Sequence, residues 1–411
     1  MSRSDLYHIW GIKGYDILPG TKYGARGTVF RVAPQDRLIK CPDCGSRNVT
    51  RKGACVRRLL ASQVGSHEKI TLEASIPIVH CKDCRARKMI DPAIALPKKS
   101  YTKGFARDVL VLLREMSVLS VARFLQVSWG MISSILTDWL EKHFSRRGLR
   151  NLRRIAIDET SVGKGHRYVT IVMDLDTGDP VFVGDGKAER ALDPFWKELG
   201  PRRARKIRCV AMDMGGAYQA AVRKNLPWAS IVFDRFHVVK LANERIDRLR
   251  RRLFAMKDFE GRELLKGSRF LLLKNPENLD ASRGEPGRLR RLLDLNSPLT
   301  TMYILKEDLR RFWEMDSREK AEEAAREFIG CARASGVPEI VSLGSVIERH
   351  MEGILNHYGD PVSSGPLEGL NNKVKALVRR AYGYRNMHVF KLLVMAARVI
   401  DPYRLRPFDT S

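Results

Sequence analysis

Two features that mark exported and membrane proteins are missing from this 411-residue sequence. No apolar run approaches the ~20 residues that a membrane-spanning helix requires, and the apolar stretch at 389–400 is broken by Lys391 and Arg398. The N-terminus does not show a charged segment followed by an apolar one, so we expect no export and a reducing, cytoplasmic environment. Fixed-period repeats and low-complexity tracts are also missing, which argues against a repeat protein. The length and a 44% hydrophobic content allow roughly three globular domains.

Acidic residues are scarce relative to basic ones. The chain has 47 Asp and Glu against 74 Lys and Arg, which gives a net charge of +27 and a pI near 10.0. Such an excess favours a polyanionic partner, and nucleic acid is the first hypothesis. The excess recurs at 202–208, 245–252 and 373–380. For any single one of these runs, a solvated basic surface is the alternative interpretation.

Four of the seven cysteines lie in two Cys-x-x-Cys steps, Cys41 with Cys44 and Cys81 with Cys84. Four thiolates suit one tetrahedral Zn²⁺, and two such steps in a short span of a reduced protein predict a structural zinc site. His80 or Cys55 could replace one of the four ligands. The residues between the pairs alternate apolar and polar as in a half-buried strand. We therefore predict a zinc-stapled β-rich module over residues 1–100, in which the metal supplies folding free energy.

Helical periodicity follows in residues 101–150. A short turn ends at Ser128, a plausible N-cap, and sets two helices at an angle as in a helix-turn-helix. The exposed side of the second helix would present Trp129, Ser133 and Ser134 to a DNA groove. A helical hairpin without a DNA role is the alternative.

Short apolar runs in residues 151–237 stop at aspartates. One run ends at Asp158, two more form a hairpin, and buried strands separated by a helix end at Asp213 and Asp234. Three antiparallel strands followed by strand, helix and strand is the element order of an RNase H-like sheet, whose first and fourth strands are parallel neighbours. Asp158 and Asp213 would then meet at one edge of the sheet, where open α/β sheets bind ligands. Each aspartate alone could simply cap the next element, and Glu159 would point to the opposite face.

Residues 363–380 predict a helix with two faces. Leu367, Leu370, Val374 and Leu377 form an apolar stripe that can pack on the sheet. Another face carries Glu368 together with basic residues, of which Lys375 and Arg379 are the candidates for DNA contact. A favourable helix dipole would explain an acid in the first turn but not the cations below it. We predict that Asp158, Asp213 and Glu368 hold two Mg²⁺ or Mn²⁺ ions, with the cations holding the nucleic-acid backbone.

In this order, "CPDC", "HCKDC", "IAIDETS", "VAMDMG", "FDRFHVVK" and "SSGPLEGLNNKVKALVRRAYGYRN" resemble the ISL3 family of bacterial insertion-sequence transposases over nearly the whole chain. The resemblance implies a DDE transposase with an RNase H-like core and a catalytic triad of Asp158, Asp213 and Glu368. It also implies that Asp234 and His237 form an Asp-x-x-His motif near the active site. A core histidine is the equal alternative for His237.

The resulting fold class is α+β. A mixed-sheet core, residues 151–237 and 362–411, is interrupted by an all-helical insertion at 238–361, and zinc-binding and helix-turn-helix modules precede it. The first helix of the insertion is rich in arginine, and Arg248 and Arg251 could line a DNA channel or form a solvated face.

The expected function is binding of terminal inverted repeats, metal-dependent strand cleavage and transfer into target DNA, by a homodimer associated with the bacterial nucleoid and without a membrane partner. A DNA-binding regulator without catalysis and an RNase H-like nuclease that does not join strands are the alternatives.

Overall fold

The structure is a computed structural model, which describes residues 9–10, 12–24, 27–63, 69–145, 148–163, 165, 167–256, 262–294, 296–362, 365–381, 384 and 386–397. The chain divides into two compact units, residues 1–145 with 399–411, and residues 146–398. Each unit is described by itself. None of the described helices is long and apolar enough to cross a bilayer.

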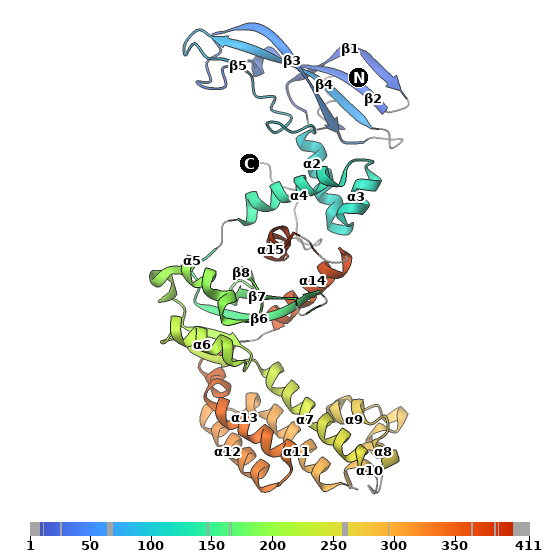
Figure 1. Ribbon diagram of the computed structural model, residues 1–411, viewed down its shortest axis with the longest axis vertical. Helices are drawn as coiled ribbons and strands as arrows, with labels where there is room; N and C mark the ends of the chain where they lie inside the picture. Colours follow the sequence, from blue (N-terminus) through green and yellow to red (C-terminus); the bar gives the residue numbers. More distant parts are fainter. Residues whose placement is uncertain are drawn as a thin grey trace. The chain divides into compact units, whose positions relative to one another are not determined.

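The first unit begins with a five-stranded sheet (Figure 1). Strands run in the order β1-β2-β4-β3, and β5 pairs with β4. In β4 buried and half-buried residues alternate along most of the strand, as the sequence pattern predicted, because one face packs on the core of this unit. The strands are β1 (Tyr15–Gly24), β2 (Gly27–Pro34), β3 (Val49–Ala61), β4 (Ile70–Cys81) and β5 (Arg87–Met89).

Three helices complete the first unit: α2 (Lys103–Glu115), α3 (Val118–Phe124) and α4 (Trp129–Phe144). The side chain of Ser128 accepts a hydrogen bond from the backbone N–H of Met131, so Ser128 is the N-cap of α4 as predicted. Ile132, Ile135 and Leu140 are buried on the inner side of α4. The helices α2, α3 and α4 pack against one another as a compact group.

A mixed five-stranded sheet forms the centre of the second unit, in the order β10-β9-β6-β7-β8. β6 pairs antiparallel with β7, β7 pairs antiparallel with β8, and β6 pairs parallel with β9. The predicted hairpin and the predicted parallel neighbours are therefore both present. The strands are β6 (Arg154–Gly163), β7 (Arg167–Asp174), β8 (Pro180–Asp185), β9 (Cys209–Met212) and β10 (Ser230–Phe233).

Helices cover both faces of this sheet (Figure 1). On one face, α5 (Asp193–Ala204) and α6 (Gly216–Asn225) pack on Ile155 and Ile157. On the other face, α14 (Gly365–Arg380) and α15 (Met387–Met395) pack on Ala156 and Ala211. Because side chains alternate along a strand, even-numbered residues of β6 face α14 and odd-numbered residues face α6.

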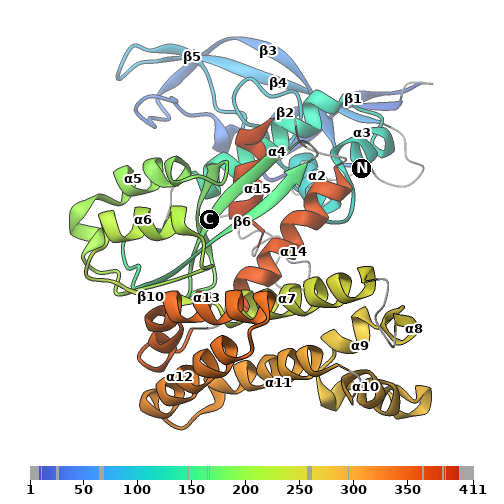
Figure 2. The same ribbon diagram turned by 60° about the horizontal axis from the view of Figure 1, so that its bottom comes forward.

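Helices fill the chain between β10 and α14, and the longest of them, α7, packs against α11 and α13 (Figure 2). A Cβ atom at Gly353 of α13 would collide with the ring of Phe233, so glycine allows this helix to approach the end of β10 closely. The helices are α7 (Arg235–Ala255), α8 (Arg262–Leu265), α9 (Arg269–Leu273), α10 (Glu285–Asp294), α11 (Ser297–Arg311), α12 (Arg318–Ala334) and α13 (Pro338–Leu355).

Candidate active site and metal centre

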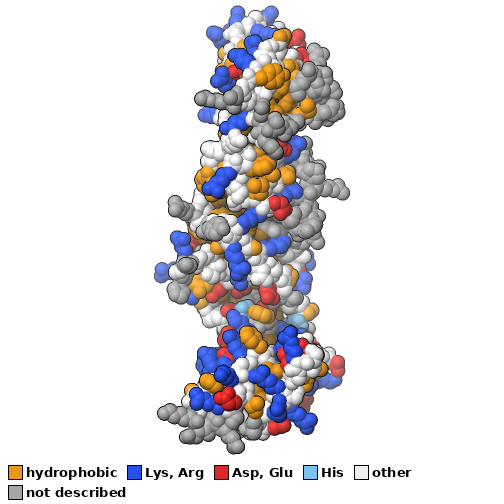
Figure 3. Space-filling view, turned by 90° about the vertical axis from the view of Figure 1, so that its right-hand side faces the viewer, with side chains coloured by type: hydrophobic (Ala, Val, Ile, Leu, Met, Phe, Trp, Pro, Cys, Tyr) orange, Lys and Arg blue, Asp and Glu red, His pale blue; other side chains and the backbone are white. Residues whose placement is uncertain are grey.

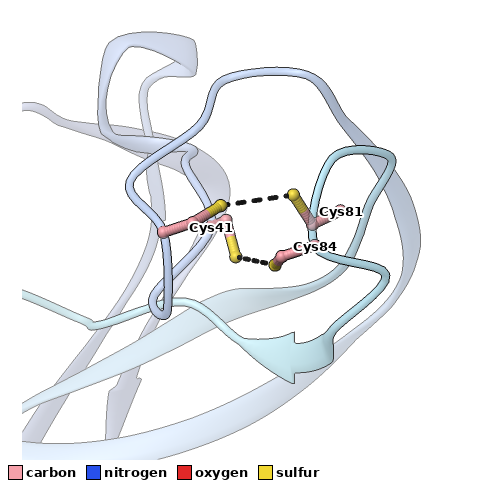
Figure 4. Close-up of side chains that lie close together, drawn as sticks. Cys41, Cys81 and Cys84 are labelled. Atoms are coloured by element: carbon pink, nitrogen blue, oxygen red, sulfur yellow. Dashed lines mark hydrogen bonds between the residues drawn. The ribbon is translucent and has the colours of Figure 1, made fainter.

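The four cysteines of the two Cys-x-x-Cys steps come together in the first unit. Their sulfur atoms all lie within 4.8 Å of one another, with Cys41 Sγ 3.5 Å from Cys84 Sγ and Cys44 Sγ 3.6 Å from Cys81 Sγ. Cys41, Cys81 and Cys84 point toward one another from two facing loops (Figure 4). Among the described residues, this is the only group of three or more metal-binding side chains with ligand atoms so close together. His80 and Cys55 lie outside it.

The chemistry of this cluster fits Zn²⁺. A hydrogen bond from the backbone of Cys44 lowers the pKa of the Cys41 thiol to about 7. The backbone of Ala86 lowers the pKa of Cys84, but hydrogen bonds with Cys41 and Cys44 outweigh this and raise the pKa to about 12. Four neighbouring thiols therefore do not all ionise by themselves. A divalent cation in tetrahedral coordination would stabilise all four as thiolates.

Asp158 and Asp213 lie near each other, just beyond the paired segment of β6 and β9. Ala156 pairs with Ala211 in the parallel ladder of β6 and β9, and each aspartate follows two residues later. Asp158 lies on β6 two residues after Ala156, so it faces the side of the sheet that α14 covers. Asp213 directly follows the last residue of β9. Asp213 also lies close enough to Asp158 for its negative charge to raise the pKa of the Asp158 carboxyl.

Each aspartate also has backbone partners. Asp158 Oδ1 accepts a hydrogen bond of 2.7 Å from the backbone of Glu159, and Asp213 Oδ1 accepts one of 2.9 Å from Gly215. Burial raises the pKa of Asp158, and the neighbouring charge of Asp213 raises it further, against lowering by the backbone of Glu159 and by His237. Two neighbouring carboxylates that repel each other are a suitable site for a divalent cation, which would hold both ionised.

Glu159 faces the opposite side of the sheet, as predicted. Its Oε2 accepts a hydrogen bond of 3.3 Å from the hydroxyl of Tyr218 on α6. That hydroxyl also lies 2.8 Å from Thr170 Oγ1 on β7. Burial raises the pKa of Glu159. These contacts assign Glu159 to the packing of α6 on the sheet.

The apolar stripe of α14 packs on the sheet as predicted, with Leu367, Leu370 and Val374 in the same core cluster as Ala156 and Ala211. Glu368, Lys375 and Arg379 are exposed on the helix. Glu368 does not form a compact group with the two aspartates. Among the described residues, only the four cysteines have three or more ligand atoms within 4.8 Å of one another. The residue of α14 that reaches Asp158 is Asn371, whose Nδ2 donates a hydrogen bond of 2.6 Å to Asp158 Oδ2.

Asn371 is not among the site residues predicted from the sequence, although its position in the sequence carries a signal. Asn371 lies four residues after Leu367 and three before Val374, within the apolar stripe. A polar residue at a position that faces the core needs a hydrogen-bonding partner there.

Asp234 and His237 lie at the start of α7, directly after β10. Asp234 is the N-cap of α7, because its Oδ1 accepts a hydrogen bond from the backbone N–H of Phe236. His237 Nε2 lies 3.6 Å from Asp234 Oδ2, and His237 is also near enough to Asp158 to lower the pKa of that carboxyl.

The candidate DNA-binding residues differ in their exposure to solvent and in their contacts within the protein. Trp129 is 56% exposed at the start of α4, and Ser133 is half-buried. Ser134 accepts a hydrogen bond of 3.2 Å from Lys99, which also pairs with Asp138.

Arg248 and Arg251 of α7 are both exposed. Arg251 also forms an ion pair of 3.2 Å with Asp247. Basic and acidic side chains are intermixed on the helical part of the second unit, at the bottom of Figure 3.

Comparisons with known proteins give a consistent result. A family model for ISL3-type DDE transposases, described as "Transposase", matches residues 155–394. The transposase for insertion sequence element IS1001 of Bordetella parapertussis is 31% identical over 402 residues, which cover 97% of this chain and 98% of that protein. The transposase for insertion sequence element IS1557 of Mycobacterium tuberculosis is 30% identical over 398 residues, which cover 90% of this chain and 88% of that protein.

Proposed function

The chain belongs to the ISL3 family of insertion-sequence transposases, and from this we propose that it binds the terminal inverted repeats of its element, cuts the DNA there and joins the 3′-hydroxyls to target DNA. Catalysis is assigned to an RNase H-like core formed by residues 151–237 and 362–411 around a helical insertion at 238–361; of these residues, those up to 398 belong to the second unit. The order of its strands supports this assignment.

Asp158, Asp213 and Glu368 are the proposed ligands of two Mg²⁺ or Mn²⁺ ions. When bound, such ions activate a water or a 3′-hydroxyl and stabilise the leaving oxygen of the phosphate. The chain would contribute Asp158 as the bridging carboxylate, with Asp213 and Glu368 each completing one site. Asp234 and His237 would lie near this site. His237 would favour the ionised form of Asp158 without being one of the three main ligands.

One observation carries this proposal. The parallel pairing of β6 and β9 supports it, because it brings Asp158 and Asp213 near each other, while α14 packs on the same sheet and carries Glu368 in its first turn. Oxygen ligands from three separate segments would thus meet beside one sheet once metal is bound. The exposure of Glu368 is compatible with this role, because three carboxylates repel one another when no metal ion is bound between them.

DNA binding is proposed for both units. In the first unit, the zinc cluster would stabilise the module of residues 1–100, and Trp129 and Ser133 at the exposed side of α4, with Ser134 beside them, would read the repeat from a helix-turn-helix of residues 101–150. In the second unit, Lys375 and Arg379 would hold the phosphates near Glu368, with Arg248 and Arg251 farther along the DNA. Because an element has two ends, we propose a homodimer, acting on the DNA of a bacterial cytoplasm.

The test uses the protein with labelled end DNA, a target plasmid and Mg²⁺. Transposition predicts cleavage at the ends and joined products. A nuclease would cut without joining, and an inactive regulator would only bind the end DNA; either result would overturn the proposal.

A further inference from the structure

The hydrogen bond between Asn371 and Asp158 joins residues 213 positions apart in the chain. Asn371 is only 8% exposed, and Asp158 is half-buried beneath α14. Hydrogen bonds to an ionised carboxylate are shorter and stronger than those between neutral groups. The bond between Asn371 and Asp158 is a direct polar link between α14 and the strand that carries Asp158.

Packing alone does not explain an amide at this position. An apolar residue would continue the stripe of Leu367, Leu370 and Val374 against the sheet, and it would avoid burying a polar group. The amide is also incompletely satisfied, because Asn371 Oδ1 is buried and has no hydrogen-bond partner in the described structure. Retaining such a residue costs stability, so a role other than packing is expected.

The geometry of a helix indicates what that role is. Glu368 precedes Asn371 by three residues, so their Cβ atoms are about 5–6 Å apart on neighbouring sides of α14. The apolar contacts of the stripe are non-directional and tolerate small rotations and shifts of the helix. A hydrogen bond to one carboxylate oxygen is directional, and it fixes both the rotation of α14 about its axis and its position along β6.

We propose that Asn371 is a positioning residue, whose amide orients the carboxylate of Asp158 and sets the register of α14, and thus of Glu368, against β6. This inference rests on the proposed metal-dependent function and specifies how the site is kept in order before metal and DNA arrive.

The test compares Asn371→Leu, Asn371→Ala and the matched control Asn372→Ala, which removes the neighbouring, exposed amide of the same helix. Binding of Mn²⁺ to the complex with end DNA is measured by calorimetry, and thermal unfolding and the affinity for end DNA are measured beside it. We expect Mn²⁺ affinity to fall about 10- to 100-fold in both Asn371 variants, as for other residues that orient metal ligands. Asn372→Ala should match the wild type in all three measurements.

Asn371→Leu decides between positioning and packing. A leucine has the same branching and the same number of side-chain heavy atoms and continues the stripe, so it should keep the melting temperature and the affinity for end DNA while Mn²⁺ binding and the maximal cleavage rate fall. Wild-type Mn²⁺ affinity in this variant would overturn the inference, even if Asn371→Ala is unstable. Failure of the proposed function is recognised separately, since Asp158→Asn would then cut end DNA as the wild type does.

Discussion

Asp158 and Glu159 are neighbours in the chain but belong to opposite faces of the sheet. Asp158 accepts a hydrogen bond from Asn371 on α14, and Glu159 accepts one from Tyr218 on α6. The alternation of side chains along β6 thus separates a carboxylate suited to a catalytic site from one that joins a helix to the sheet.

This separation predicts different effects of removing the two charges. Asp158→Asn should lower cleavage of end DNA by more than about 100-fold, because a metal ligand is lost. Glu159→Gln should retain cleavage within about 10-fold, since its amide can still accept the hydrogen bond of Tyr218. Initial rates of nicking on labelled end DNA measure both. Equal losses in the two variants would show that the face of the sheet does not decide the role.

The raised pKa of Asp158 predicts a pH dependence of stability in the metal-free protein. Because the folded state holds this proton more tightly than the unfolded chain does, its contribution is complete below the unfolded pKa of about 3.9 and is lost as the pH rises through the folded pKa. Asp158→Asn cannot titrate, so its melting temperature should rise relative to that of the wild type as the pH increases above about 4.

Added Mg²⁺ should reduce this difference at neutral pH, because the metal stabilises the ionised carboxylate. Melting curves of both proteins, with and without Mg²⁺, provide the measurement. A difference in melting temperature that is constant over the whole pH range would contradict a raised pKa of Asp158 in the folded protein.

The cysteine cluster predicts one zinc ion per chain. Cys41→Ser should lose that zinc and destabilise the first unit, because structural Zn²⁺ supplies an apparent ~10–16 kcal/mol of binding free energy to small modules. Cys55→Ser is the matched control, since Cys55 is exposed on β3 and lies outside the cluster. Elemental analysis and limited proteolysis follow metal content and folding; zinc retained by Cys41→Ser would exclude the assigned ligand set.

Two residues of α4 should differ in their importance for DNA recognition. Trp129 is largely exposed at the start of the helix, whereas Ser134 already accepts a hydrogen bond from Lys99. Trp129→Ala should weaken binding to end DNA about 10-fold with less effect on random DNA, as loss of a base contact would. Ser134→Ala should bind nearly as the wild type does. Filter binding against both DNAs tests this, and an unchanged preference in Trp129→Ala would remove α4 from recognition.

The sequence predicted what depends on local patterns. Runs of apolar residues located β6 and β9, two Cys-x-x-Cys steps located the cluster, and Ser128 marked the start of α4. Contacts between segments far apart in the chain could not be predicted in the same way. The bond from Asn371 to Asp158 depends on how α14 docks, and the bond from Lys99 to Ser134 on how a loop returns to α4. Periodicity shows which face of a helix is buried, but not which partner a polar group on that face meets.

Glu368 gives the most direct test of the proposed active site, because it must join Asp158 and Asp213 once metal and DNA are bound. Calorimetric titration of Mn²⁺ into the complex with end DNA counts the ions held by the wild type and by Glu368→Gln. We predict two ions per active site in the wild type and fewer in Glu368→Gln, with the affinity for DNA unchanged. Two ions held equally tightly by Glu368→Gln would contradict this prediction.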